Sequence, residues 1–257
     1  MGVFINREST IFELLMMNTQ LLCTKSKLEK IINRFQEYLK NDDNNSEAIS
    51  SHKTYIQTAQ LPVTKGMIEI CDRKVEANGK YIERLHSLFS EDNDIDQDYW
   101  TEMYNKLCEQ YNEINNLKTM AVQFLKSLVV PFYEPETAYG EQYMSGQADT
   151  SPTIEDNTDL SEYYRYIIDS YAKELEVLRT AIAYYSGKLL RVDNLLRDLH
   201  GLYYQANILN DSLTIAIQQL ENIGVTRNGN YYYHNVDCSA FENLEATIES
   251  LDMAVSV

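Results

Sequence analysis

The segment from Ser51 to Asp72 reads SHKTYIQTAQLPVTKGMIEICD and decides how the chain begins to fold. Its proline, Pro62, cannot donate a backbone hydrogen bond, and its ring clashes with the preceding turn, so a helix is expected to stop before it. Proline suits the first turn of a new helix, because the N–H groups there have no partner within the helix. The segment therefore predicts two helices that meet at a fixed corner, the second beginning at Pro62.

A long amphipathic helix is predicted before this corner. Over residues 11–39, apolar side chains recur at intervals of three and four, and polar residues interrupt the stripe at Asn18 and Lys25. This spacing is typical of a heptad-like helical seam. Ser9 and Thr10 are the expected caps at its start. A short helix over roughly 47–60 is expected to follow it.

More helices are predicted after the corner. One runs from Pro62 to about Ser90, and another carries the apolar stripe of residues 100–128 before Pro131 ends it. Helical spacing resumes at Leu160 and continues to Leu220, with Gly187 and Gly201 as points that weaken the helix.

The rest of the chain is predicted to be a linker, a hairpin and a last helix. Proline, glycine and acidic residues without helical spacing predict a linker over 131–158. Asn228-Gly229 between β-favouring residues predicts a small hairpin over 224–234, followed by a short helix capped by Ser239. The fold class is therefore all-α, an elongated bundle of long antiparallel helices with a small β-hairpin near the C-terminus. The expected regions are 1–130, the linker 131–158, and 159–257.

Composition narrows the classes of function. The net charge is −17, so the surface repels phosphate backbones and anionic lipid, and neither nucleic-acid binding nor peripheral membrane binding is expected. No run of about 20 apolar residues or basic leader segment is present, so a membrane span and export through the general secretory route are not expected. The 20 tyrosines suit half-buried seams and partner surfaces.

No motif predicts catalysis, a metal or a cofactor. The four histidines lie far apart, no phosphate-binding glycine motif or nucleophile elbow occurs, and the four cysteines lack zinc-ligand spacing. Three cysteines, which lie within helical apolar patterns, are expected to be buried free thiols: Cys23, Cys71 and Cys108.

The residues around the corner resemble the LXG domain, which carries polymorphic toxins into the type VII secretion system of Gram-positive bacteria. That family has Ala-x-x-x-x-Lys-x-Tyr, then a proline that opens a long helix bearing Lys-Gly. The eponymous Leu-x-Gly is replaced here by Asn44-Asn45-Ser46. The resemblance covers about 45–85 in sequence detail and about 1–220 in architecture. The matching positions are Ala48, Lys53, Tyr55, Pro62, Lys65 and Gly66.

The resemblance implies a non-catalytic targeting domain with a fold similar to WXG100 hairpins extended into a rod. Such domains bind small helical WXG100-like or Lap-type partner proteins, and the secretion ATPase recognises the joint surface. The chain would be cytoplasmic before export and then secreted, with any toxin activity in a further C-terminal domain. A physical argument also favours helical partners, because the stripes over 11–39 and 100–128 need cover and an extended hairpin covers one side of each helix.

Type VII substrates often carry a Tyr-x-x-x-Asp/Glu signal. Two segments fit, one from Tyr38 to Asp42 and one from Tyr233 to Asp237, and on a helix each pair would share a face. The residues implied in partner binding or targeting are thus Tyr55, Pro62, Lys65, Gly66, Tyr233 and Asp237.

Two alternatives from other classes stay open. In the first alternative, the chain is a cytosolic helical immunity or chaperone-like protein that neutralises a toxin. In the second alternative, the chain is an enzyme whose active site lies in 225–257, around Asn228, Tyr231 and His234.

Overall fold

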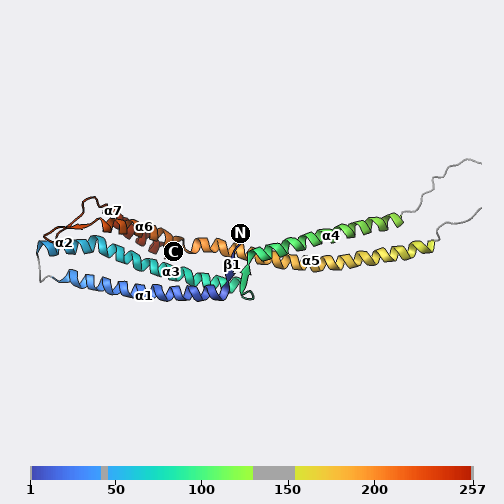
Figure 1. Ribbon diagram of the computed structural model, residues 1–257, viewed down its shortest axis with the longest axis horizontal. Coiled ribbons are helices and arrows are strands. Elements are labelled where there is room, and N and C mark those ends of the chain that lie inside the picture. The colour runs from blue at the N-terminus through green and yellow to red at the C-terminus, as the bar shows by residue number, and fades with distance from the viewer. Residues whose placement is uncertain (1, 42–45, 130–153, 256–257) are drawn as a thin grey trace, which may run out of the picture. The chain divides into compact units, whose positions relative to one another are not determined.

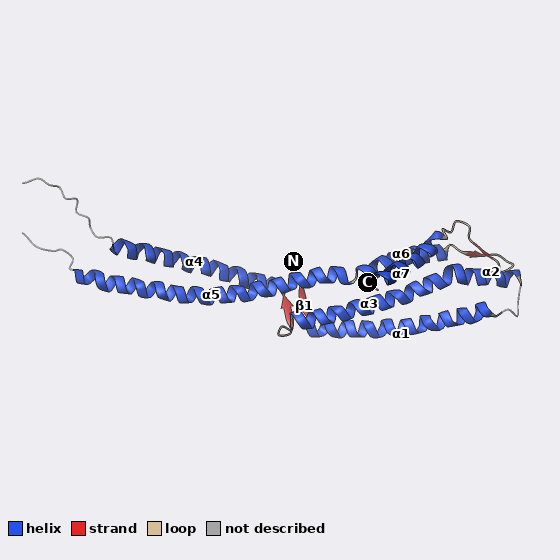
Figure 2. Ribbon diagram, turned by 180° about the vertical axis from the view of Figure 1, so that it is seen from behind, coloured by secondary structure: helices blue, strands red, loops and turns tan. Residues whose placement is uncertain are grey.

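The computed structural model describes residues 2–41, 46–129 and 154–255. Nearly all of these residues are helical and the strands are two or three residues long, which confirms the predicted all-α class (Figure 2). The chain divides into two compact units. Unit 1 comprises Met1–Val3 and Asp96–Leu190, and unit 2 comprises Phe4–Ile95 and Arg191–Val257.

These units differ from the consecutive segments 1–130, 131–158 and 159–257, because elements far apart in sequence pack together. Residues 130–153 lie outside the described part, and helix α5 (Ile154–Leu202) already includes 154–158 of the expected linker. Its residues up to Leu190 belong to unit 1 and the later ones to unit 2.

Unit 2 is built around helix α3 (Leu61–Leu88). Helix α1 (Arg7–Lys40) lies along one side of α3, and helices α6 (Tyr204–Glu221) and α7 (Ser239–Val255) pack on it and on each other (Figure 1). The core forms where α3, α6 and α7 meet. Its buried members are Ala59, Val63, Ile70, Leu209, Leu213, Ala216, Phe241 and Leu244.

The predicted stripe of α1 faces α3, and its two polar interruptions are paired there. The Lys25 ammonium lies 2.7 Å from Oδ1 of Asp72, and Asn18 Oδ1 accepts a 2.7 Å hydrogen bond from Asn78. Asn78 is 1% exposed and also accepts a hydrogen bond from the Tyr203 hydroxyl. Buried polar groups need such partners, so these contacts select one register of α1 against α3.

The corner predicted at Pro62 is absent. Helix α2 (Glu47–Tyr55) continues into a π-helical turn, η1 (Ile56–Gln60), and then into α3, with helical backbone angles at the junctions. The Leu61 N–H donates to the carbonyl of Ile56, five residues back. A π turn is wider than an α turn, so it makes room for the proline ring, and the missing N–H falls in the first turn of α3. The predicted corner was wrong, because a π turn before the proline lets the helix continue through it.

The start of α1 also differs from the prediction. The helix begins at Arg7, and the Asn6 side chain caps it by accepting a 2.9 Å hydrogen bond from the Ser9 N–H. Asn6 ends strand β1 (Phe4–Asn6), which pairs with strand β2 (Asp94–Asp96). Strands of three residues carry no periodic signal, so neither was predicted.

The C-terminal predictions are largely confirmed. Strands β3 (Gly224–Val225) and β4 (Tyr231–Tyr232) form an antiparallel hairpin, and Gly229 in its turn has φ +83°, a conformation that glycine adopts without strain. Helix α7 begins at Ser239 as expected. Its cap differs, because Oδ1 of Asp237 accepts from both the N–H and the hydroxyl of Ser239.

Unit 1 is a pair of antiparallel helices, α4 (Gln97–Val129) and the first part of α5. Contacts join the start of α4 to a late part of α5, and the end of α4 to an early part of α5. The Lys188 ammonium lies 4.7 Å from the centre of the Trp100 ring, and the Phe124 and Tyr164 rings are 4.6 Å apart. Gly187 does not break α5, because its cost of about 1 kcal/mol is small against the other turns of a 49-residue helix. The break comes at Tyr203, two residues after the expected Gly201.

Candidate partner-binding site

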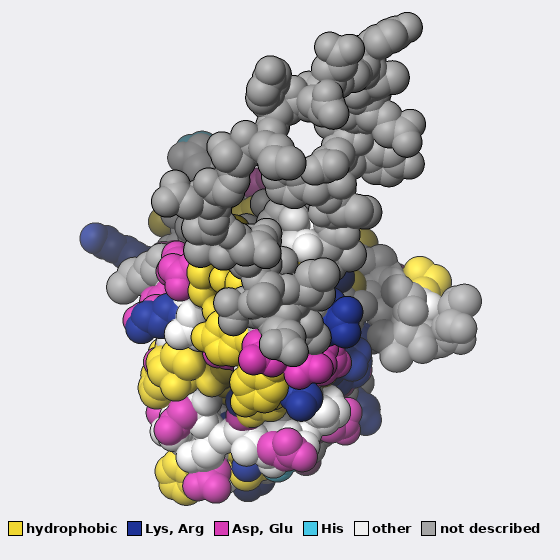
Figure 3. Space-filling view, turned by 90° about the vertical axis from the view of Figure 1, so that its right-hand side faces the viewer, with side chains coloured by type: hydrophobic (Ala, Val, Ile, Leu, Met, Phe, Trp, Pro, Cys, Tyr) yellow, Lys and Arg dark blue, Asp and Glu magenta, His cyan; other side chains and the backbone are white. Residues whose placement is uncertain are grey.

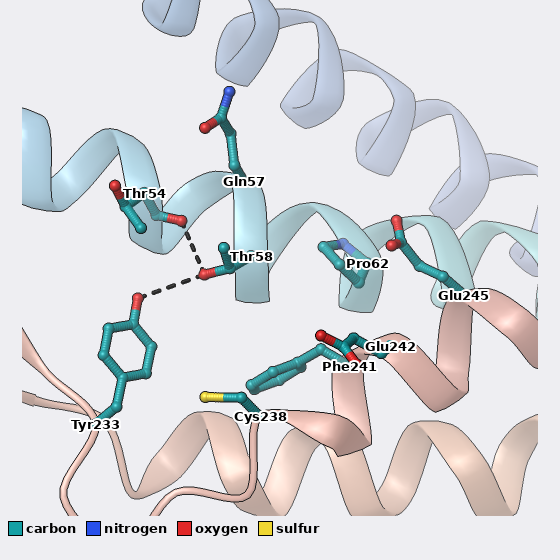
Figure 4. Close-up of a pocket in the computed structure, with 9 residues that line it drawn as sticks. All are labelled: Thr54, Gln57, Thr58, Pro62, Tyr233, Cys238, Phe241, Glu242 and Glu245. Atoms are coloured by element: carbon teal, nitrogen blue, oxygen red, sulfur yellow. Dashed lines mark hydrogen bonds between the residues drawn. The ribbon is translucent and has the colours of Figure 1, made fainter.

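The structure brings the two predicted groups of site residues together in unit 2. Pro62, which opens α3, and Tyr233, which follows the hairpin, line one pocket of about 430 Å³. Figure 4 shows the Tyr233 ring opposite η1, where its hydroxyl lies 3.5 Å from Oγ1 of Thr58. The remaining wall comes from the start of α7, including Cys238, Phe241 and Glu242. The pocket thus joins segments that are 175 residues apart in sequence.

Lys65 and Gly66, the Lys-Gly of the resemblance, contact α7 in two different ways. The Lys65 ammonium lies 3.2 Å from Oε1 of Glu245, and both side chains are about half exposed. Gly66 is buried, and a Cβ atom placed on it would lie 3.1 Å from Leu244 and 3.3 Å from Leu213. This glycine therefore lets α3 approach α6 and α7 closely, which is a packing role.

Tyr55 anchors the hairpin to α2. Its ring stacks on Tyr231 at 4.2 Å with an interplanar angle of 13°, and His52 stacks on the same ring at 5.3 Å. The Tyr38 hydroxyl lies 3.1 Å from Nδ1 of His52, so one stack links α1, α2 and β4. Burial raises the pKa of the Tyr231 hydroxyl. Sequence reasoning missed this stack, because no spacing rule connects His52 to Tyr231.

Asp237 has a structural role, because its side chain caps the start of α7. Residues 233–237 lie in a turn and not in a helix, so Tyr233 and Asp237 do not share a helical face. The reason is that Asp237 itself caps α7. For the other candidate signal, Asp42 lies outside the described residues. The residues of the alternative enzyme hypothesis do not form a hydrogen-bonded group. Among the described residues, no hydrogen bond links Asn228, Tyr231 and His234 to one another.

A second surface of interest is one face of α1. Apolar side chains beside its buried stripe remain exposed to water, at 64% for Phe12, 52% for Leu15, 48% for Met16 and 51% for Leu22. These four residues form the exposed α1 face. Their spacing of three, one and six residues places them on one side of the helix. Cys23 is also exposed, contrary to the expectation of a buried thiol, whereas Cys71 is buried and Cys108 is half-buried.

Acidic and hydrophobic side chains also lie side by side on the surface that Figure 3 draws. Within the described residues, no helix is long and apolar enough to cross a membrane. Nor is any group of three His, Cys, Asp or Glu in the described part placed to hold a metal ion.

Comparison with known proteins adds no family. No protein-family model matches the chain, and neither the curated proteins nor the solved structures contain a match. The resemblance to LXG domains therefore stays a prediction from the sequence, with its matching positions between Ala48 and Gly66.

Proposed function

We propose that this chain is a non-catalytic targeting domain of a type VII secretion substrate. It binds small helical partner proteins of the WXG100-like or Lap type, and the joint surface is then read by the secretion ATPase. It is made in the cytoplasm and leaves through that system.

The exposed α1 face is the observation that carries this proposal. Leaving apolar area in water is unfavourable by about 25 cal/mol per Å², and exposed contiguous apolar patches commonly mark interaction sites. Phe12, Leu15 and Leu22 follow the spacing of a helical seam, which a partner helix covers by packing along it. Helix α1 already packs on α3 with its other stripe, so it has a rigid support.

Unit 1 supports the same proposal independently. Its two helices cover each other on one side only, and apolar side chains of α4 stay partly exposed beside that contact, at 47% for Leu117, 64% for Met120 and 44% for Phe124. Each unit therefore offers apolar helical surface of the kind that helical partners bind.

The test is co-expression of the chain with the small helical proteins encoded beside it, followed by size exclusion and an export assay. We expect a stable complex that is lost in the double variant Phe12→Ser/Leu22→Ser. The matched control, Glu13→Ser/Gln20→Ser, changes exposed residues of the same helix and should bind normally. Circular dichroism should show that both variants keep their helices.

The proposal fails if the chain is monodisperse alone, binds none of these proteins and is never exported. A complex with a toxin instead, without export, would favour the cytosolic immunity or chaperone-like function.

A further inference from the structure

The pocket beside η1 has an apolar floor and an acidic rim. Phe241 is 2% exposed and Pro62 is fully buried, and both line the pocket. Glu242 and Glu245 stand three residues apart on α7, so they lie on the same side of the helix. Figure 4 shows both carboxylates on the pocket side of α7, with the Tyr233 ring on the opposite wall.

The two carboxylates differ in their partners. Glu245 is paired with the Lys65 ammonium at 3.2 Å. Glu242 makes no ion pair with any described cation, although it is exposed at the pocket rim. The pocket therefore carries one uncompensated negative charge close to aromatic rings.

This combination matches one chemical class of ligand. An arginine or lysine side chain has an apolar stem that suits the floor and a cationic head that suits carboxylates and ring faces. Arginine fits better than lysine, because its planar guanidinium stacks on rings and binds carboxylates through two N–H groups. The pocket volume is at the lower end of the range for ligand sites, about 300–1,000 Å³.

We infer that this pocket receives an arginine side chain from a basic segment of a partner protein. A protein is the expected source, because the net charge of −17 steers basic partners to the surface. Lys65 acts as a competitor, since it holds one of the two carboxylates that the incoming guanidinium would use. This site is independent of the helical partner proposed for the exposed α1 face, because the two surfaces share no residue.

Cys238 provides a direct reporter, since it lines the pocket and is exposed. We would alkylate the whole chain with iodoacetamide and follow each cysteine by mass spectrometry, with and without N-acetyl-arginine amide. With about 20 mM of this compound, above a millimolar Kd, alkylation of Cys238 should slow at least about threefold. The neutral citrulline analogue has nearly the same shape and should not slow it.

Two variants then separate the carboxylates from the competitor. Glu242→Gln should abolish the protection, whereas Lys65→Gln should strengthen it by freeing Glu245. Glu249→Gln, on an exposed position of α7 outside the pocket, is the matched control and should behave as the unchanged chain.

Two further cysteines serve as internal standards. Cys23 on α1 should react at the same rate throughout, and the buried Cys71, whose pKa burial raises, should stay unreactive while the chain is folded. Equal protection by the citrulline analogue, or none by the arginine compound, would overturn the inference. Either result would leave partner binding by the exposed α1 face unaffected.

Discussion

Helices α3 and α4 have the same apolar spacing but very different surroundings. Ten residues of α3 are buried, whereas the buried positions of α4 are Trp100 and Ala121. The difference comes from their neighbours, because α3 packs against α1, α6 and α7, whereas α5 is the one helix that packs along α4 in the described part of unit 1. Helical spacing therefore predicts which face of a helix is apolar, and the number of packed neighbours decides how much of that face is buried.

Truncating a core leucine should give the largest contrast between the units. Leu244 is fully buried in the core of unit 2, so Leu244→Ala should lower its free energy of unfolding by about 2–5 kcal/mol. Leu117 on α4 is 47% exposed, so Leu117→Ala should change the stability of unit 1 by less than about 0.5 kcal/mol. Hydrogen exchange measured by mass spectrometry assigns each loss to its own unit. Similar effects of the two variants would contradict the comparison.

Removing the buried amide between α1 and α3 should have an intermediate effect. Asn78→Ala takes a partner away from both Asn18 and the Tyr203 hydroxyl, which should cost about 1–3 kcal/mol. Asn115→Ala, on the exposed side of α4, is the control and should stay within about 0.5 kcal/mol. Denaturant unfolding followed by circular dichroism measures both. If Asn78→Ala lowers the free energy of unfolding by less than the control does, the Asn78 amide does not select the register of α1 against α3.

The smallest effect is expected from the ion pair between α1 and α3. The hydrogen bond to Asp72 raises the pKa of Lys25 above its usual value of about 10.5. The folded state thus holds this proton more tightly than the unfolded state. The resulting stability is fully present below the usual lysine pKa and is lost as the pH rises through the raised folded-state value. Because both side chains are partly exposed, the contribution should be less than about 1 kcal/mol.

Lys25→Met should remove this part of the alkaline loss of stability, which unfolding midpoints at neutral and alkaline pH would reveal. Lys106→Met in unit 1 is the matched control, since its ion pair with Glu102 lies within one exposed helix and joins no two elements. If Lys106→Met changes the alkaline loss of stability more than Lys25→Met does, the expected difference between the two ion pairs is wrong.

Much of unit 2 could be predicted from the sequence, and the exceptions have physical causes. The stripe over 11–39, the hairpin turn at Gly229 and the last helix follow from local spacing and backbone preference. The corner at Pro62 was wrong, because a π turn accommodates proline without ending the helix. The cap at Asn6 was missed, because it depends on the pairing of β1 with β2 across 88 residues.

The candidate site was predicted only in part. Tyr55, Pro62 and Lys65 were selected by resemblance. Of these, Pro62 lines the pocket together with Tyr233, and that meeting depends on how α7 packs against α3. Glu242 and Phe241 carried no signal, since one acid and one aromatic in a short helix are common. Gly66 was selected for its place in a motif, but its position against Leu244 gives it a packing role.

Local sequence patterns are enough to predict that this protein is built of long helices, where their apolar stripes run, and where the chain turns back in a hairpin. These properties depend on residues close together in the chain, whose spacing and backbone preferences act locally. Other properties became visible only in the folded chain: Pro62 lies inside a continuous helix, some stripes are covered and others are not, and an acidic pocket forms beside η1. Those outcomes depend on contacts between α3, α6 and α7, and no local pattern encodes which helices become neighbours.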